Sequence, residues 1–101
     1  MRYVNLTPHA IILNDGRTFE PSGSIARVAV SFSEIQSDVC EQVYGEVENL
    51  PEPQPDTVYI VSGIVLGACS ERSDVVAPAT GHNLTVRNDK GHIVSVPCFV
   101  K

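Results

Sequence analysis

The chain has 101 residues, of which 43% are hydrophobic and 19% charged, and its net charge is −5. This length is enough for one domain with a modest core. Its seven basic residues never occur three in a row, so the chain lacks the clustered Lys and Arg that follow a phosphate backbone, and we expect no nucleic-acid partner. The small share of charged residues favours a homo-oligomer, because an interface removes apolar surface from water.

The three cysteines, Cys40, Cys69 and Cys98, are widely spaced and form no CxxC pair. A secreted disulfide framework has an even number of cysteines at closer spacing. The N-terminus carries no apolar leader segment, and the longest apolar runs fall far short of the ~18 residues that span a membrane. We therefore expect a cytoplasmic protein with reduced thiols and no membrane partner.

The first third of the chain predicts short strands joined by tight turns. Residues 3–6 form a strand that stops at Pro8, because proline removes a backbone donor. Residues 10–13 and 18–19 flank Asp15-Gly16, a pair typical of a hairpin turn. After a second turn at Pro21-Ser22-Gly23, residues 25–32 alternate between apolar and small or polar side chains and predict a half-buried strand.

Residues 33–44 allow two structures. Ser33 and Gln36 have the spacing of a capping box, and Ile35, Val39 and Val43 lie four apart, which suits a helix. The alternative is a hairpin that turns at Ser37-Asp38. The β-rich flanking segments favour the hairpin.

The most apolar stretch, residues 57–78, predicts a strand, a short helix and a second strand. Residues 57–61 form the first strand, a helix follows over about 63–71, and residues 75–77 form the second strand. Three alternate prolines precede this unit, so residues 50–56 run extended over the surface. A last hairpin joins residues 84–87 to 92–96. The sequence thus predicts one α+β domain, residues 1–101, with a mixed and mostly antiparallel sheet and a compact βαβ-like unit.

The βαβ-like unit also predicts a ligand site. If the helix starts near Gly63, Ser62 is its N-cap, where free backbone N–H groups favour an anion or polar group. Sites in such units gather at the carboxyl ends of strands. The loop after the second strand, with Thr80, Gly81 and His82, would then lie beside Ser62. The alternative is that Ser62 only caps the helix and the loop faces solvent.

Two further groups of residues are candidates for ligand contacts. Arg72 could bind a carboxylate or phosphate while Asp74 holds it in place, or the two could form an ordinary surface pair. Asn5, Thr7 and His9 place polar groups just after the first strand, where His9 could be a ligand contact or a structural residue. The histidines lack HxxxH and HExxH spacing, so we predict no metal site.

No catalytic motif is present. The Gly-x-Ser-x-Gly elbow and the glycine-rich phosphate loops are missing, and Cys69 and Cys98 lie in apolar patterns typical of core thiols. Glu46 and Glu48 alternate on one face of a strand, as expected for a solvated surface. We assign no catalytic residue and no cofactor, and catalysis is the less favoured hypothesis.

Five segments of the chain form a specific combination of motifs. They are Val4–His9, Pro21–Gly23 with Ala26-Arg27, Tyr44–Pro53, Tyr59–Ser62 and Arg72–Pro78. Together they resemble a family of small proteins encoded by bacteriophages, prophages and some bacteria, over nearly the whole chain except residues 33–42. The resemblance implies a protein that acts in the cytoplasm of an infected bacterium, where small phage proteins often sequester or inhibit host defence signals, including cyclic nucleotides and ADP-ribose derivatives.

These observations lead to one main hypothesis and two alternatives. The main hypothesis is a non-enzymatic protein that binds a small anionic, nucleotide-like host molecule through the Ser62 helix start, Arg72, Arg27 and the polar turn at His9. The first alternative is a protein inhibitor of a host enzyme or defence factor, acting through a strand edge or an acidic face. A small hydrolase using His9 or His82 is less favoured.

Overall fold

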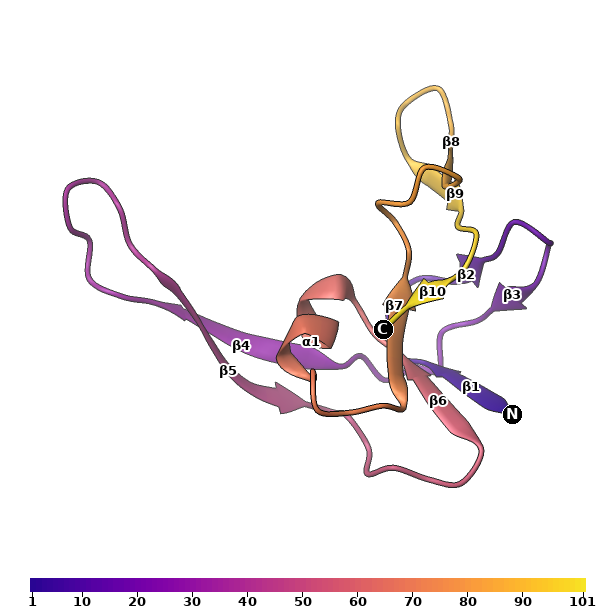
Figure 1. Ribbon diagram of the computed structural model, residues 1–101, viewed down its shortest axis with the longest axis horizontal. Coiled ribbons are helices and arrows are strands. Elements are labelled where there is room, and N and C mark those ends of the chain that lie inside the picture. Colours follow the sequence, from indigo (N-terminus) through magenta and orange to yellow (C-terminus); the bar gives the residue numbers. More distant parts are fainter.

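The computed structural model describes residues 1–101 and is built on a four-stranded sheet with the strand order β1-β6-β7-β10 (Figure 1). Strands β1, β6 and β7 are parallel, and β10 is antiparallel to β7. The helix α1 connects β6 to β7. The bounds are β1 Arg2–Asn5, β6 Thr57–Ile60, α1 Gly63–Ala68, β7 Val75–Pro78 and β10 Phe99–Val100.

Three antiparallel ribbons surround this mixed sheet, which confirms the predicted α+β class. Both tight turns predicted from glycine have the positive φ that glycine tolerates, 97° at Gly16 and 81° at Gly91. The ribbons are β2 (Ile11–Ile12) with β3 (Thr18–Phe19), β4 (Arg27–Phe32) with β5 (Gln42–Glu48), and β8 (Val86–Arg87) with β9 (Ile93–Ser95).

The helix is shorter than the sequence predicted, ending at Ala68 instead of about residue 71. Its C-cap, Cys69, donates its backbone N–H to the carbonyl of Leu66, three residues back, and Arg72 then donates to the carbonyl of Cys69. These i→i+3 bonds tighten the chain and turn it toward β7. The helix therefore ends at Ala68, because Cys69 has left helical geometry, with φ −118° and ψ 34°.

Residues 33–44 belong to a hairpin, so the helical alternative was wrong. Strands β4 and β5 pair from Arg27↔Glu48 to Phe32↔Gln42, and an isolated bridge joins Gln36 to Val39. Ser37 and Asp38 both have positive φ, 50° and 69°. Two such residues in succession are typical of a type I′ turn, whose twist matches that of the flanking strands.

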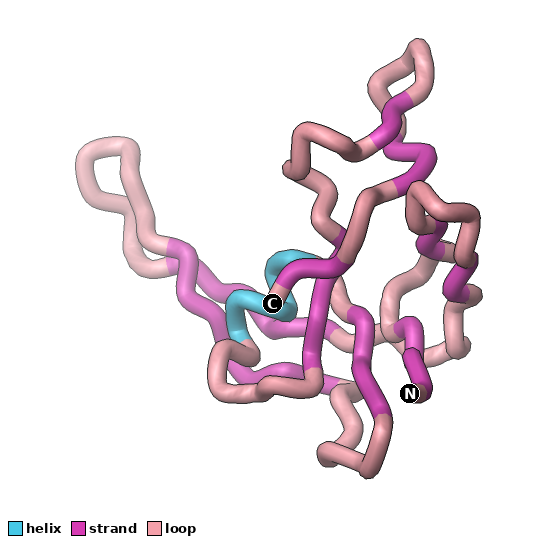
Figure 2. The backbone as a smooth tube through the Cα atoms, turned by 45° about the vertical axis from the view of Figure 1, so that its right-hand side comes forward, coloured by secondary structure: helices cyan, strands magenta, loops and turns pink.

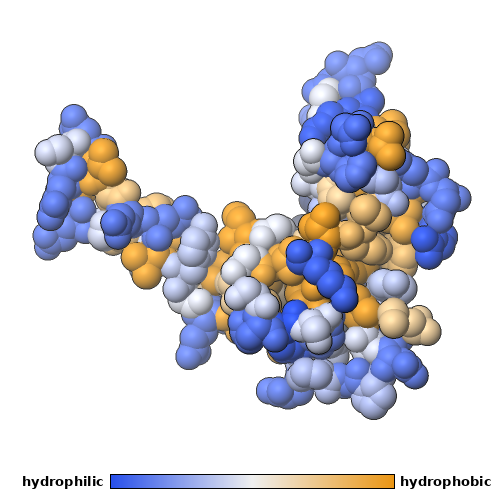
Figure 3. Space-filling model, in the orientation of Figure 1, coloured by the Kyte–Doolittle hydropathy of each residue, from blue (hydrophilic) through white to orange (hydrophobic).

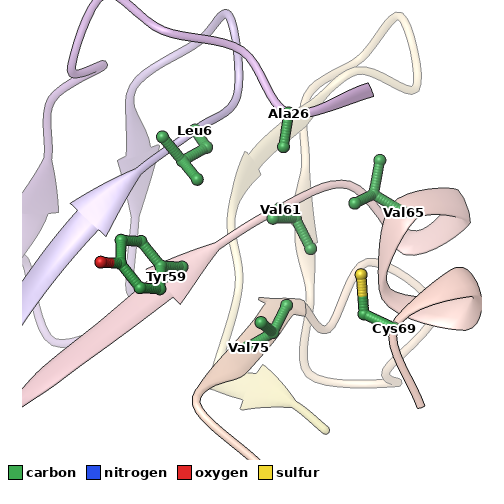
Figure 4. Close-up of a cluster of buried hydrophobic side chains, with 7 residues drawn as sticks. All are labelled: Leu6, Ala26, Tyr59, Val61, Val65, Cys69 and Val75. Carbon is green, nitrogen blue, oxygen red and sulfur yellow. The ribbon is translucent and has the colours of Figure 1, made fainter. Parts of the chain in front are cut away.

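The core consists of two apolar clusters, one on each face of the central sheet. The larger cluster lies under α1 and joins side chains from β6, α1 and β7 with Leu6 and Ala26 (Figure 4). The second contains Ile60 and Val76, which pack against Ile11, Leu13 and Val96 of the ribbons. Alternation along β6 explains the two clusters, because Tyr59 and Val61 point to one face and Ile60 to the other.

The β4–β5 hairpin projects from this body, as the tube in Figure 2 makes clear. The expected half-buried strand over residues 25–32 is therefore correct only at its base: Ala26 is buried and Val28 partly buried, whereas Val30 and Phe32 are 39% and 66% exposed. The radius of gyration, 15.3 Å, exceeds the ~13 Å of a compact chain of this length. The hairpin accounts for the excess.

No helix of the structure has the length and apolar character needed to cross a membrane.

Candidate functional site

Three segments that follow parallel strands meet at one edge of the central sheet. Because β1, β6 and β7 are parallel neighbours, their carboxyl ends at Asn5, Ile60 and Pro78 lie along the same edge (Figure 1). The residues that follow are the 7–10 turn, Ser62-Gly63, and the loop with Thr80. Crevices at the carboxyl ends of parallel strands are common ligand sites.

A hollow of about 420 Å³ opens at this edge, here called the strand-end hollow. Its volume lies in the ~300–1,000 Å³ range of small-molecule sites. Strand β9 of the β8–β9 ribbon forms part of its wall. Its lining consists of residues 7–12, Ser62, Gly63, Pro78, Thr80 and residues 93–96.

Five of the predicted site residues line this hollow: Thr7, His9, Ser62, Gly63 and Thr80. No Asp or Glu lines it, and His9 is its one ionisable side chain. In a chain of net charge −5, a wall without carboxylates is a local departure from the acidic average. The hydroxyls of Ser62 and Thr80 can donate to a sugar or phosphate oxygen, whereas the hydroxyl of Thr7 already donates to Asn5 Oδ1 and can only accept.

Asn5 holds the 7–10 turn in place and is itself unavailable to a ligand. Its Oδ1 accepts hydrogen bonds from the backbone N–H and the hydroxyl of Thr7, at 2.9 and 2.6 Å. Its Nδ2 donates to the carbonyls of His9 and Phe19, both at 2.9 Å. Asn5 is 2% exposed, so it positions Thr7 and His9 without reaching the hollow.

Ser62 is the N-cap of α1, as predicted. Its Oγ accepts the backbone N–H of Val65 at 3.3 Å. The helix has only six residues, so its dipole is weaker than the predicted nine-residue helix would provide. Ser62 thus has both roles that the sequence left open, because it caps the helix and lines the hollow.

The loop after β7 contributes unequally. Thr80 lines the strand-end hollow, whereas Gly81 and His82 line a smaller neighbouring hollow of about 330 Å³ that also includes Gly63 and Thr80. The Nδ1 of His82 accepts the backbone N–H of Leu84 at 3.0 Å. One ring nitrogen of His82 is therefore engaged in holding the loop, and only Nε2 is free.

Arg72 and Asp74 form a structural clamp away from the strand-end hollow. The guanidinium donates two hydrogen bonds of 2.8 Å to the carboxylate and a third to the carbonyl of Pro51 at 2.9 Å. These bonds lower the pKa of Asp74 and raise that of Arg72. Arg72 also borders a shallow hollow of about 560 Å³ under α1, but three of its five N–H donors are already used.

Arg27 stands apart from the other candidates. It begins β4, is exposed and does not line the strand-end hollow. The cation near the hollow is instead Arg87, which the sequence analysis did not single out. Its guanidinium donates to the carbonyl of Thr80 at 3.2 Å and of Gly91 at 3.0 Å, and it forms no ion pair.

The β9 wall of the hollow was also missed. It is fixed by contacts between distant parts of the chain: the Ser95 hydroxyl donates to Asn14 Oδ1 at 2.6 Å, and the Asn14 side chain donates to the Leu84 carbonyl. The residues of the first pair are 81 positions apart. No local pattern predicts such a contact, so periodicity alone could not have placed β9 there.

The lining of the site consists of hydroxyls, one imidazole and apolar side chains. No group of three or more His, Cys, Asp or Glu side chains is close enough to hold a metal ion. Cys69 is buried, as predicted, and burial raises the pKa of its thiol. Cys98 is exposed, so the prediction that it is a core thiol was wrong. The arrangement can bind a small polar molecule through hydroxyls, one imidazole and an apolar strip from Ile93 to Val96.

Fold and site together define a small α+β protein with a polar hollow at the carboxyl ends of three parallel strands. No protein-family model, no curated protein and no solved structure matches the chain. The resemblance to small phage proteins therefore remains a prediction from the sequence motifs.

Proposed function

We propose that this protein is a non-enzymatic binder that sequesters a small anionic, nucleotide-like molecule in the strand-end hollow. The observation that carries the proposal is that Thr7, His9, Ser62 and Thr80, from three segments far apart in the sequence, line one hollow. A volume of about 420 Å³ suits a ligand of nucleotide size better than a macromolecule.

The residues that line the hollow fit both the sugar–phosphate part and the base of such a ligand. Hydroxyl groups along one wall suit ribose and phosphate oxygens, whereas Ile93, Val94 and the edge of Pro78 offer an apolar surface for a base. Arg87 supplies the positive charge beside Thr80. Since it has no carboxylate partner and uses two N–H groups on carbonyls, its remaining donors are free for an anion.

The biological setting comes from the sequence motifs. A phage protein with this site would remove a host signal, such as a cyclic nucleotide or an ADP-ribose derivative, by stoichiometric binding in the bacterial cytoplasm. Sequestration of this kind requires no catalytic group.

Isothermal titration of the purified protein with ADP-ribose, cyclic dinucleotides and cyclic trinucleotides tests the proposal. We expect one of these probes to bind, and ribose without phosphate to bind much more weakly. Thr80→Val should lower the affinity for that probe about tenfold, the effect of one hydrogen bond of about 1.4 kcal/mol. The proposal fails if no probe releases or absorbs heat, or if Thr80→Val binds as the wild type does.

A matched pair of charge variants tests whether Arg87 is the cation that contacts the ligand. Arg87→Ala should weaken binding and reduce its dependence on salt, because the positive charge beside Thr80 is lost. Arg17→Ala removes the same charge from an exposed pair with Asp15 on the β2–β3 ribbon and should bind as the wild type does. Equal losses in both variants would reveal a general charge effect instead of a contact at the hollow.

A further inference from the structure

The outer part of the β4–β5 hairpin carries apolar side chains that nothing in the chain covers. Figure 3 shows hydrophobic side chains exposed on this hairpin. Six large ones are between 39% and 76% exposed: Val30, Phe32, Ile35, Val39, Val43 and Tyr44. An isolated two-stranded hairpin is only marginally stable in water. This segment therefore lacks the third strand or second layer that would stabilise it.

The apolar face of the hairpin continues from the core. Val28 and Val47 pair with each other and pack against the cluster under α1. Beyond a shift of register between Val28 and Val30, Val30 pairs with Tyr44, and Phe32 lies two residues further along β4 on the same face. The helix α1 contacts both strands near their base but leaves the outer residues exposed.

Strand β4 has a free edge. The backbone of residues 27–32 makes no hydrogen bond outside the β4–β5 pair, so every second N–H and C=O of β4 points to solvent. Natural proteins protect such edges with Lys, Pro or inward-pointing charges. From Val28 to Ser33 the sequence is Val-Ala-Val-Ser-Phe-Ser, which contains none of these.

The two edges of the hairpin differ in charge, and this difference indicates which edge can pair with a second copy of the chain. The β5 side carries Glu41, Glu46 and Glu48, so two β5 strands side by side would bring carboxylates together, which is destabilising. Apart from Arg27 at its start, β4 is uncharged from Val28 to Phe32 and causes no such repulsion. Among the exposed edges of this molecule, β4 thus offers an uncharged run that a second β4 can complement.

We propose that β4 pairs antiparallel with β4 of a second copy of this chain, which joins the two hairpins into a four-stranded sheet. A twofold axis at Val30 places Val28 opposite Phe32 of the second copy and Arg27 opposite the uncharged Ser33. The apolar faces of both hairpins then form one continuous surface. The seven residues paired on each strand (27–33) bury less than the ~800 Å² per partner of a standard interface, so we expect a weak, concentration-dependent dimer.

This interface is separate from the strand-end hollow. None of the residues 28–33 lines the hollow, so the dimer and the ligand proposal can fail independently. Two exposed valines provide matched variants for the test. Val30 is 39% exposed in β4, and Val86 is 46% exposed in β8.

Sedimentation velocity over a range of protein concentrations tests the interface. We expect the wild type to be dimeric at high concentration, Val30→Lys to be monomeric with an unchanged circular dichroism spectrum, and Val86→Lys to dimerise as the wild type does. A wild type that is monomeric at all concentrations overturns the proposal, because β4 then does not pair with a second copy of the chain. A Val30→Lys variant that still dimerises overturns it as well.

Cysteine cross-linking tests the pairing without relying on a disruptive variant. The natural exposed thiols are first removed by Cys40→Ser and Cys98→Ser. Residues on the axis of an antiparallel pair have Cα atoms ~4.5–5.5 Å apart, within disulfide range, so Val30→Cys should cross-link to itself on mild oxidation. Tyr44→Cys should not, because three strand spacings of ~4.8 Å separate its two copies by about 14 Å. Cross-linking of Tyr44→Cys but not Val30→Cys would overturn edge pairing in favour of face-to-face packing.

Discussion

The side chain of Asn5 accepts two hydrogen bonds from Thr7, one from its backbone N–H and one from its hydroxyl, at 2.9 and 2.6 Å. With the two bonds that it donates to His9 and Phe19, the buried amide uses all the hydrogen-bonding capacity that its geometry allows. Asn5 thus converts the end of β1 into a fixed turn that forms one wall of the strand-end hollow.

Asn5→Ala should lower the free energy of unfolding by about 2–3 kcal/mol, because several buried partners lose their hydrogen bonds at once. Urea unfolding measures the change. Asn83→Ala is the control, since Asn83 is exposed and its side chain makes no hydrogen bond, and it should be neutral. A loss below about 1 kcal/mol for Asn5→Ala would mean that water replaces the amide.

The capping role of Ser62 predicts a difference between two substitutions. Ser62→Ala should destabilise the protein by about 0.5–1 kcal/mol, because the Val65 N–H loses its acceptor. Ser62→Asp keeps an acceptor at the N-cap and should recover this loss, as thermal or urea unfolding can show. If both variants are equally unstable, the 3.3 Å contact contributes nothing to stability.

The clamp between Arg72 and Asp74 predicts a stability that depends on pH. Because the pKa of Asp74 is lowered from its ordinary value of 3.8 by the hydrogen bonds from Arg72, the folded state binds fewer protons than the unfolded chain near that pH. The stabilisation is complete only well above the unfolded-state pKa of 3.8 and is lost as the pH falls through the lower, folded-state pKa.

Asp74→Asn should therefore be less stable than the wild type at pH 7, by about 1–2 kcal/mol for a partly buried charge-assisted pair. The difference should shrink as the pH falls below about 4, because the wild type then loses the same charge. Urea titrations between pH 2 and 7 (about the range in which a carboxylate titrates) measure it. Asp89→Asn, at an exposed residue without an ion pair, should keep the wild-type dependence.

The three thiols should differ in reactivity. Cys40 and Cys98 are exposed, whereas Cys69 is 2% exposed and its burial raises the pKa of the thiol. Since the thiolate is the reactive form, a thiol reagent should modify two cysteines quickly and the third only on unfolding. Cys40→Ser should reduce the fast phase to one thiol. A fast phase of three would show that the core under α1 opens readily.

Local patterns determined most of the elements. The Asp15-Gly16 and Gly91 turns, the strand–helix–strand unit and the Ser62 cap all follow from residue types and spacing within a few positions. The helix end was misplaced because the chain already leaves helical geometry at Cys69 and turns toward β7, which the apolar spacing does not reveal. Burial along β4 was overestimated because alternation shows which side chains share a face, but not whether anything covers that face.

The site was only partly predictable. Ser62 and Thr80 could be placed together from the βαβ-like unit, because neighbouring parallel strands end at the same edge. Arg72 and Asp74 had the right chemistry for an ion pair, but the Pro51 carbonyl that fixes Arg72 comes from a segment 21 residues away. No sequence pattern around Arg87 indicated that its side chain lies beside Thr80.

The sequence by itself determined that this is a small α+β chain with polar turns after its strands, since turn and strand preferences act over a few residues. Only the tertiary structure decided that β1 lies parallel to β6, about fifty residues later in the chain, and that β9 docks beside β2. Those contacts bring the His9 turn, Ser62, Thr80 and the β9 wall to one hollow. Burial of apolar faces drives such pairings between distant segments, and it depends on the whole chain.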